Sequence, residues 1–207
     1  MHGNGRSRKG APKQKSNFLR YFEGYSEVRS VGSDGKVKVD MVYTAPYWVH
    51  DLTSRQWKQR KLCFVGLMIL TVALYLCAAF MPLGENYNRY VLIPGGLTAA
   101  LLLFFITYVI PYLVCPRKMT IYDYEHNYTS VRRWSFMTAV GLAASGIMSV
   151  AYLILGNGDQ WIKTLLCIVC YFAAAVSSFT IYKIEDKTEY YEEENENGNG
   201  YTPYSSY

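Results

Sequence analysis

Charged residues are almost absent from four long stretches of this 207-residue sequence, which together contain only one, Lys163. Elements of a soluble domain keep a polar face toward water, and these stretches have no such face. An uncharged apolar run of about 20 residues crosses the roughly 30 Å hydrocarbon core of a membrane as a helix. We therefore predict an all-α membrane protein, and a soluble bundle with buried helices is the alternative. The four predicted spans cover residues 62–83, 90–115, 134–155 and 161–182.

Ionisable residues are also missing from the middle of every predicted span, because Lys163 lies near the end of the fourth. Intramembrane ionisable residues usually mark proton relays, ion paths or substrate sites. Their absence argues against a proton-coupled transporter, an intramembrane metalloprotease and any enzyme with its chemistry at the midplane. A pore lined by Thr, Ser and Tyr stays open, as does a site at the membrane surface.

Cysteine is missing from the two predicted external turns, so the sequence implies no extracytoplasmic disulfide framework. Cys167 and Cys170 are spaced to lie on one helix face, and we interpret them as packing residues. We predict no cofactor. All five cysteines lie within or at the edge of a span: Cys63, Cys77, Cys115, Cys167 and Cys170.

Lysine and arginine are unevenly distributed around the spans. They gather before the first span and between the second and third, and such clusters stay on the cytoplasmic side. We therefore predict two helical hairpins with both termini cytoplasmic. The net charge of +5 indicates attraction to an anionic inner leaflet rather than to nucleic acid. The basic residues assigned to the lipid surface are Arg55, Lys58, Arg60, Lys61, Arg117, Lys118, Arg132 and Arg133.

The chain divides into three parts by composition. Residues 1–43 form a basic segment, disordered over 1–15, in which "DGKVKVDMVY" alternates like a strand that pairs with "EVRSV". Residues 44–183 form the transmembrane domain, whose first helix begins at a capping box of Thr53 and Gln56. Residues 184–207 form an acidic, Tyr-rich tail that we predict to be disordered.

Two segments of the chain resemble each other without a gap. Thr44–Ser54 and Thr120–Ser130 share Thr, His and Thr-Ser at the same positions, which indicates an internal duplication or a chance similarity. A duplication would make His50 and His126 equivalent. With nearby carboxylates they are weak candidates for a metal or acid–base site. Their spacing fits no known metal motif, and packing is the commoner role of such histidines.

Small residues repeat on the third and fourth spans. Small residues let helix backbones approach closely inside a membrane, so we expect these two helices to be the closest pair. The residues assigned to helix packing are Gly141, Ser145, Ser149 and Ser177.

Three functions fit these features. The first is a non-enzymatic scaffold or accessory subunit of a membrane complex, with residues 44–61 and 118–133 as its docking surface. The alternatives are a small homo-oligomeric transporter or channel subunit, and an enzyme that acts at the cytoplasmic membrane surface through His50 and His126. The expected partners are membrane lipids and either another protein or further copies of the chain. The expected location is a bacterial inner membrane, with a eukaryotic internal membrane as the alternative.

Overall fold

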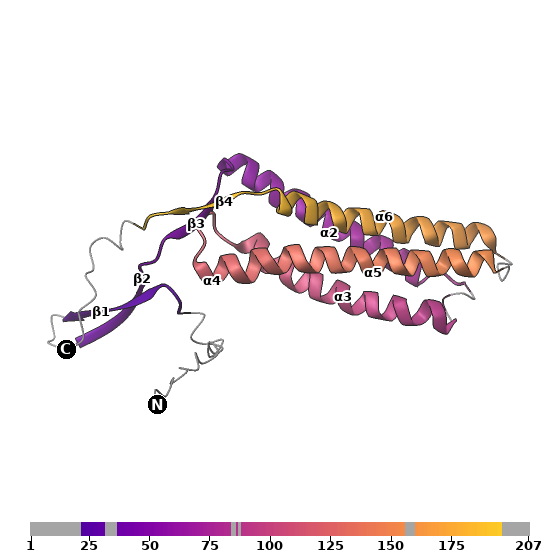
Figure 1. Ribbon diagram of the computed structural model, residues 1–207, viewed down its shortest axis with the longest axis horizontal. Coiled ribbons are helices and arrows are strands. Elements are labelled where there is room, and N and C mark those ends of the chain that lie inside the picture. Colours follow the sequence, from indigo (N-terminus) through magenta and orange to yellow (C-terminus); the bar gives the residue numbers. More distant parts are fainter. Residues whose placement is uncertain (1–21, 32–36, 84–85, 87, 156–159, 196–207) are drawn as a thin grey trace, which may run out of the picture.

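The computed structural model describes residues 22–31, 37–83, 86, 88–155 and 160–195, and its long helices lie side by side (Figure 1). Four of the described helices are long and apolar enough to cross a membrane, as the sequence predicts. Helical hydrogen bonding satisfies the backbone within each segment, which lipid surroundings demand. These helices are α2 (Ser54–Ala79), α3 (Arg89–Val114), α5 (Thr129–Ile154) and α6 (Trp161–Asp186).

Helix α2 begins at the predicted capping box. The Thr53 hydroxyl accepts a hydrogen bond from the Gln56 N–H, and the Gln56 side chain accepts one from the Thr53 N–H at 2.9 Å. Two donors of the first turn are thereby satisfied without tertiary contacts. The start of the helix is therefore fixed by local sequence.

Helix α5 is extended toward the N-terminus by two short elements. These are α4 (Ile121–Asp123) and η2 (Tyr124–Tyr128), a π-helical turn, so that the helical run covers Ile121–Ile154. The Thr120 side chain caps this run by accepting a hydrogen bond from the Asp123 N–H. Single π turns inside α-helices are frequent at functional sites.

The closest helix pair is α5 and α6, which confirms the prediction for the third and fourth spans. Helix α2 packs mainly on α6, and α3 packs mainly on α5. The consecutive helices α2 and α3 contact each other little, so they do not form a tight hairpin. Hydroxyls on α6 contribute to both of its contacts: Ser177 Oγ donates to the Leu67 carbonyl at 3.0 Å, and Ser178 Oγ donates to the Ser135 carbonyl at 2.9 Å.

The small-residue stripe of α5 faces α3 over part of its length rather than α6. A Cβ added at Gly141 would lie 2.8 Å from Leu101 Cδ1 on α3, and Ser145 Oγ lies 3.0 Å from Thr98 Oγ1. Ser149 is also buried. Helices α3 and α5 therefore come close at residue 141, where a larger residue would require the Leu101 side chain to move.

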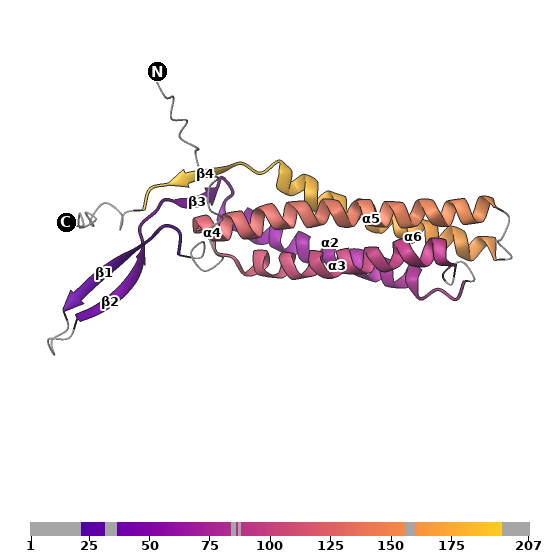
Figure 2. The ribbon, with the colours of Figure 1, turned by 60° about the horizontal axis from the view of Figure 1, so that its bottom comes forward.

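In the part of the chain that the structure describes, four strands lie beyond one end of the helices (Figures 1 and 2). The antiparallel hairpin of β1 (Tyr25–Val31) and β2 (Val37–Tyr43) is the one that the alternation predicts. A second antiparallel pair joins β3 (Tyr47–His50) to β4 (Tyr190–Glu193). In the described part of the chain, the segments nearest to both termini lie at this same end.

Strand β4 differs from the predicted disordered tail. Helix α6 continues to Asp186, and β4 follows it, because the strand pairs with β3 and Asn195 Nδ2 donates to the Tyr43 carbonyl at 2.7 Å. Several predictions lie outside the described residues. They are the disorder of residues 1–15, the Asp34-Gly35 turn, most of the two external turns and the tail from residue 196.

We call residues 43–57, 115–128 and 185–195 the end layer. Backbone hydrogen bonds between Trp48 and Met119, 2.9 Å in each direction, join its first two segments. Tyr43 Oη accepts a hydrogen bond from the Ile121 N–H at 3.1 Å and donates one to the Pro46 carbonyl. The end layer is thus held together by contacts between distant parts of the sequence.

Candidate functional site

A cluster of ionisable groups with a buried carboxylate lies where the helices meet the end layer. Four side chains from four elements meet there: Arg60 of α2, Tyr112 of α3, Glu185 from the last turn of α6 and Tyr190 of β4. Glu185 and Tyr112 are completely buried. We call these four residues the Glu185 cluster.

Both carboxylate oxygens of Glu185 accept a hydrogen bond from a phenol. Tyr112 Oη donates to Oε2 at 3.0 Å, and Tyr190 Oη donates to Oε1 at 2.8 Å. Arg60 Nη1 lies 4.0 Å from Oε2 and supplies the compensating charge. A buried carboxylate is tolerated only when it is paired and hydrogen-bonded, and both conditions are met here.

Arg60 also satisfies the end of helix α6. Its Nη2 donates to the Ile184 carbonyl at 2.8 Å and to the Thr188 hydroxyl. The last carbonyls of a helix lack partners within the helix and favour cations. One guanidinium therefore caps α6 and balances the charge of Glu185.

Tyr190 acts as a donor in the Glu185 cluster. Burial and the neighbouring Glu185 carboxylate both raise the pKa of Tyr190 above its ordinary value. The phenol consequently keeps its proton at neutral pH and continues to donate to the carboxylate.

His50 lies beside the Glu185 cluster and is completely buried. Its ring lies 4.1 Å from the Trp57 ring and meets Tyr190 edge-on at 6.2 Å, centroid to centroid. Its Nδ1 accepts a hydrogen bond from the Leu52 N–H at 3.3 Å. Burial, with a contribution from nearby Arg and Lys side chains, lowers the pKa of His50 below its ordinary value of 6.5. The imidazole is therefore neutral at pH 7.

Three buried polar atoms around the cluster have no hydrogen-bond partner within the described part of the chain. They are Nε2 of His50, Nε1 of Trp57 and Nη1 of Arg60. Buried polar groups are normally satisfied, so these atoms represent unused hydrogen-bonding capacity. Each of the two Glu185 oxygens, by contrast, accepts a hydrogen bond.

Lys61 makes a second link between α2 and the end of α3. Its Nζ donates to the Cys115 carbonyl at 2.7 Å and lies 5.1 Å from the centroid of a Trp57 ring. Asn127 Nδ2 donates to Cys115 Sγ at 3.7 Å from the other side. Lys61 and Arg60 thus make inward contacts, although the sequence assigns both to the lipid surface.

The other six residues of that basic set are exposed. Lys118 pairs with Glu193 at 2.8 Å, and Arg132 pairs with Asp186 at 2.7 Å. The remaining four stand on the first turns of α2, in the connection after α3 and on α5: Arg55, Lys58, Arg117 and Arg133.

The two candidate histidines have different surroundings. His50 is enclosed, whereas His126 is exposed on η2 and stacks on Tyr122 at 5.4 Å between ring centroids. Within the described ranges, no three His, Cys, Asp or Glu side chains are arranged to hold a metal ion.

The two similar segments do not adopt equivalent structures. Thr44–Ser54 contains strand β3, whereas Thr120–Ser130 is helical from Ile121. Instead of being related by symmetry, the segments pack on each other: Trp48 stacks on Tyr124 with ring centroids 4.2 Å apart and planes 6° from parallel. The two similar segments are therefore neighbours in the structure, and they differ in conformation.

Sequence reasoning did not identify Glu185, Tyr112 or Tyr190 as a group. A carboxylate that directly follows a long apolar run was the available signal for Glu185. Tyr112 lies 73 residues from Glu185 in the sequence, so nothing local pairs them.

The chain matches no protein-family model, and neither a curated protein nor a solved structure matches it. Because both oxygens of Glu185 are engaged and enclosed, the cluster is suited to clamp β4 and the end layer onto α2, α3 and α6.

Proposed function

We propose that this chain is a multi-pass membrane protein that serves as a non-enzymatic scaffold or accessory subunit, and that its β1–β2 hairpin binds a partner protein. The observation that carries the proposal is an apolar stripe on β2. Val37, Val39 and Met41 are 62%, 51% and 47% exposed. Alternate residues of a strand point to the same face, so these three side chains form one row.

The opposite face of β2 carries Lys38, Asp40 and Val42. Lys38 and Asp40 alternate with the apolar residues and form an exposed ion pair at 3.2 Å. A two-stranded hairpin is marginally stable in water by itself, and an apolar row on one face favours a covering partner. The row is therefore better explained by a bound protein than by solvent.

The position of the hairpin favours a protein over lipid tails. It lies beyond the end of the helices, away from their apolar surfaces (Figures 1 and 2). Among the described strands, β1 and β2 pair only with each other, so both are edge strands of a two-stranded sheet. Free edges accept a further strand, which is a common mode of peptide recognition.

The end layer supports this role by giving the hairpin a fixed base. The sequence suggests segments 44–61 and 118–133 as the docking surface. They contact each other and the helices, and part of their surface stays exposed, including Arg55, Lys58 and His126. The hairpin adds an apolar row to this exposed surface. A scaffold protein requires a rigid part and an exposed binding surface, and the end layer and the β1–β2 hairpin fit these two roles.

We further propose that the end layer faces the cytoplasm of a cell membrane, a bacterial inner membrane being the expected one. The basis is the gathering of the eight basic residues at the end of the helices that carries the strands. A cysteine-reactive label that cannot enter cells should fail to reach a cysteine placed at Lys38 in intact cells. Labelling from outside would reverse this orientation.

The partner hypothesis is tested by purifying the full chain in mild detergent from the membranes of the cells that make it, followed by mass measurement of the complex. The triple variant V37S/V39S/M41S should lose a stoichiometric partner protein that the unchanged chain retains. The matched control is K38S/D40S, which alters the opposite face of the same strand and should keep the partner.

Other outcomes would contradict the proposal. If V37S/V39S/M41S and K38S/D40S retained the partner equally, the apolar row of the hairpin would not be part of the interface. A partner-free homo-oligomer that conducts ions in liposomes would favour the channel. An activity lost in both H50A and H126A, with the fold intact, would favour the surface enzyme.

A further inference from the structure

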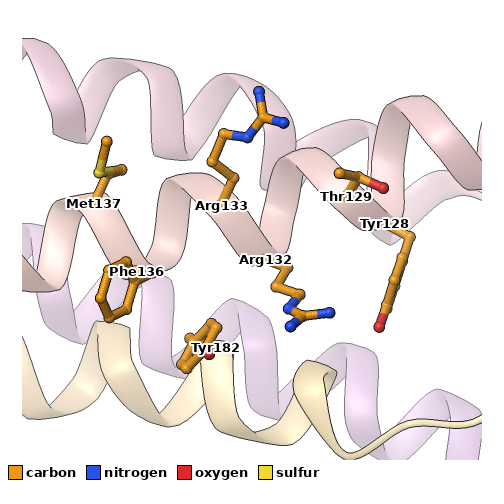
Figure 3. Close-up of a pocket in the computed structure, with 7 residues that line it drawn as sticks. All are labelled: Tyr128, Thr129, Arg132, Arg133, Phe136, Met137 and Tyr182. Carbon is orange, nitrogen blue, oxygen red and sulfur yellow. The ribbon is translucent and has the colours of Figure 1, made fainter.

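An open cavity of about 490 Å³ lies on the first turns of α5, beside α6 and next to the end layer (Figure 3). Its lining comes from both helices and changes character along the helix axis. Thr129, Arg132 and Arg133 provide polar groups, whereas Phe136, Met137 and Tyr182 provide apolar surface.

The polar and apolar parts are one helical turn apart. Phe136 follows Arg132 by four residues, and Met137 follows Arg133 by four, so each arginine has an apolar neighbour on its own face. In Figure 3 Phe136 and Met137 lie on one side of the arginines, and Thr129 lies on the other. The cavity thus passes from charged to apolar toward the middle of the bundle.

The charge of the cavity is positive. Arg132 Nη2 pairs with Asp186 Oδ1 at 2.7 Å, which leaves one carboxylate for two guanidinium groups. Arg133 is exposed and forms no salt bridge with any residue that the structure describes.

The cavity lies at the level along α5 where the apolar part of this helix begins. Arg132 and Arg133 are the last charged residues before an uncharged run that begins at Trp134. Trp134 stacks on Phe104 at 4.6 Å and on Tyr108 at 5.9 Å between ring centroids, and such rings favour the headgroup level. Arginine at this depth reaches phosphate while its alkyl stem stays among apolar groups.

We propose that this cavity binds the headgroup phosphate of an anionic phospholipid. The guanidinium group of Arg133, which lies on the same side of α5 as Thr129 in Figure 3, holds the phosphate oxygens, which suit the planar donor fork of arginine. Arg132 is directed to the other side of α5 and adds positive charge beside this site. The Thr129 hydroxyl donates a further hydrogen bond. The first part of one acyl chain lies on Phe136 and Met137. Basic pockets beside transmembrane helices are a recurrent form of lipid recognition.

The test uses the full chain purified in detergent and titrated with mixed micelles that contain dioleoylphosphatidylglycerol. Binding is followed by native mass spectrometry. The unchanged chain should retain the anionic lipid, and R132Q/R133Q should bind it at least tenfold more weakly. R133Q alone leaves the Arg132–Asp186 pair intact and should weaken binding in the same direction.

The matched control is R55Q/K58Q, which removes the same two charges from exposed positions on α2 outside the cavity. It should bind the anionic lipid as the unchanged chain does. The melting temperature without added lipid, measured for every variant, separates loss of binding from loss of fold.

Three results would overturn the proposal. Equal weakening in R55Q/K58Q and R132Q/R133Q would indicate attraction to the surface charge as a whole. Equal retention of dioleoylphosphatidylcholine would remove the preference for an anionic headgroup. Displacement of the lipid by millimolar inorganic phosphate would assign the cavity to free phosphate.

Discussion

The middle of the helical bundle and its strand-bearing end satisfy buried polar groups in different ways. In the middle, hydroxyls bond to the carbonyl one turn earlier in their own helix, as Thr71 does to Leu67 at 2.8 Å and Ser135 does to Val131 at 2.7 Å. At the strand-bearing end, Glu185 depends on Arg60, Tyr112 and Tyr190, each from a different element. Some hydroxyls of the bundle thus find a partner within their own helix and others, such as Ser177 and Ser178, on one neighbouring helix. Glu185, by contrast, requires three other elements at once.

This difference indicates where the protein is vulnerable. A hydroxyl that bonds its own helix stays satisfied when neighbouring helices shift. A buried carboxylate loses its donors and its counter-charge together when one element moves. The strand-bearing end should therefore respond to single substitutions more strongly than the middle.

The largest effect is expected for Glu185→Ala. Removing the carboxylate leaves Arg60 as an uncompensated buried cation and two phenols without acceptors, a change that typically costs about 3–5 kcal/mol of unfolding free energy. The measurement is denaturant unfolding of the full chain in detergent. Glu189→Ala, at an exposed carboxylate near the same helix end, should change stability by less than about 0.5 kcal/mol. Similar losses of unfolding free energy in Glu185→Ala and Glu189→Ala would mean that the buried cluster is no more sensitive than an exposed site.

The next largest effect is expected in the middle of the bundle, where α3 and α5 approach each other. Gly141→Val would push a side chain against Leu101 and Thr98 and should cost about 1–3 kcal/mol. Gly66→Val is the control, because a Cβ at Gly66 meets nothing within 4 Å. Thermal unfolding in detergent compares the two variants. A stable Gly141→Val protein would mean that the small residue does not limit the helix approach.

A smaller effect is expected from protonation of His50. Its pKa is lowered in the folded state, so the unfolded chain takes up a proton first as the pH falls below 6.5, and stability should decrease there. The melting temperature measured from pH 8 to pH 5 reports this loss. His50→Asn keeps an acceptor near Nδ1, cannot titrate and should flatten the decrease. His126→Asn should leave the decrease unchanged, and equal flattening by both variants would contradict the assignment to His50.

The smallest effect is expected for Lys118→Ala. The Lys118–Glu193 pair is exposed on both sides, and such pairs contribute about 0–1 kcal/mol. Its contribution should disappear in 1 M salt, where the screening length is about 3 Å. The measurement is unfolding in detergent at low and high salt. A salt-independent loss of unfolding free energy above about 1 kcal/mol would mean that this exposed pair contributes as much as a buried one.

The amino-acid sequence was sufficient for the features that depend on near neighbours. A long apolar run indicates by its composition alone that lipid surrounds it. The four long helices could therefore be predicted from the apolar runs at residues 62–83, 90–115, 134–155 and 161–182. The capping box at Thr53 and the alternation of Val37, Val39 and Met41 are equally local. The sequence therefore determined the helices, the start of α2 and the β1–β2 hairpin.

Only the tertiary structure decided which distant groups meet. It placed α2 on α6 rather than on its neighbour α3, ordered residues 190–193 as a strand against β3, and separated the surroundings of His50 and His126. It also enclosed Glu185 with a tyrosine from 73 residues earlier. Hydropathy describes what surrounds a segment, but it does not specify a partner. The position of a buried charge depends on which donors the packed helices and strands bring within hydrogen-bonding distance of it.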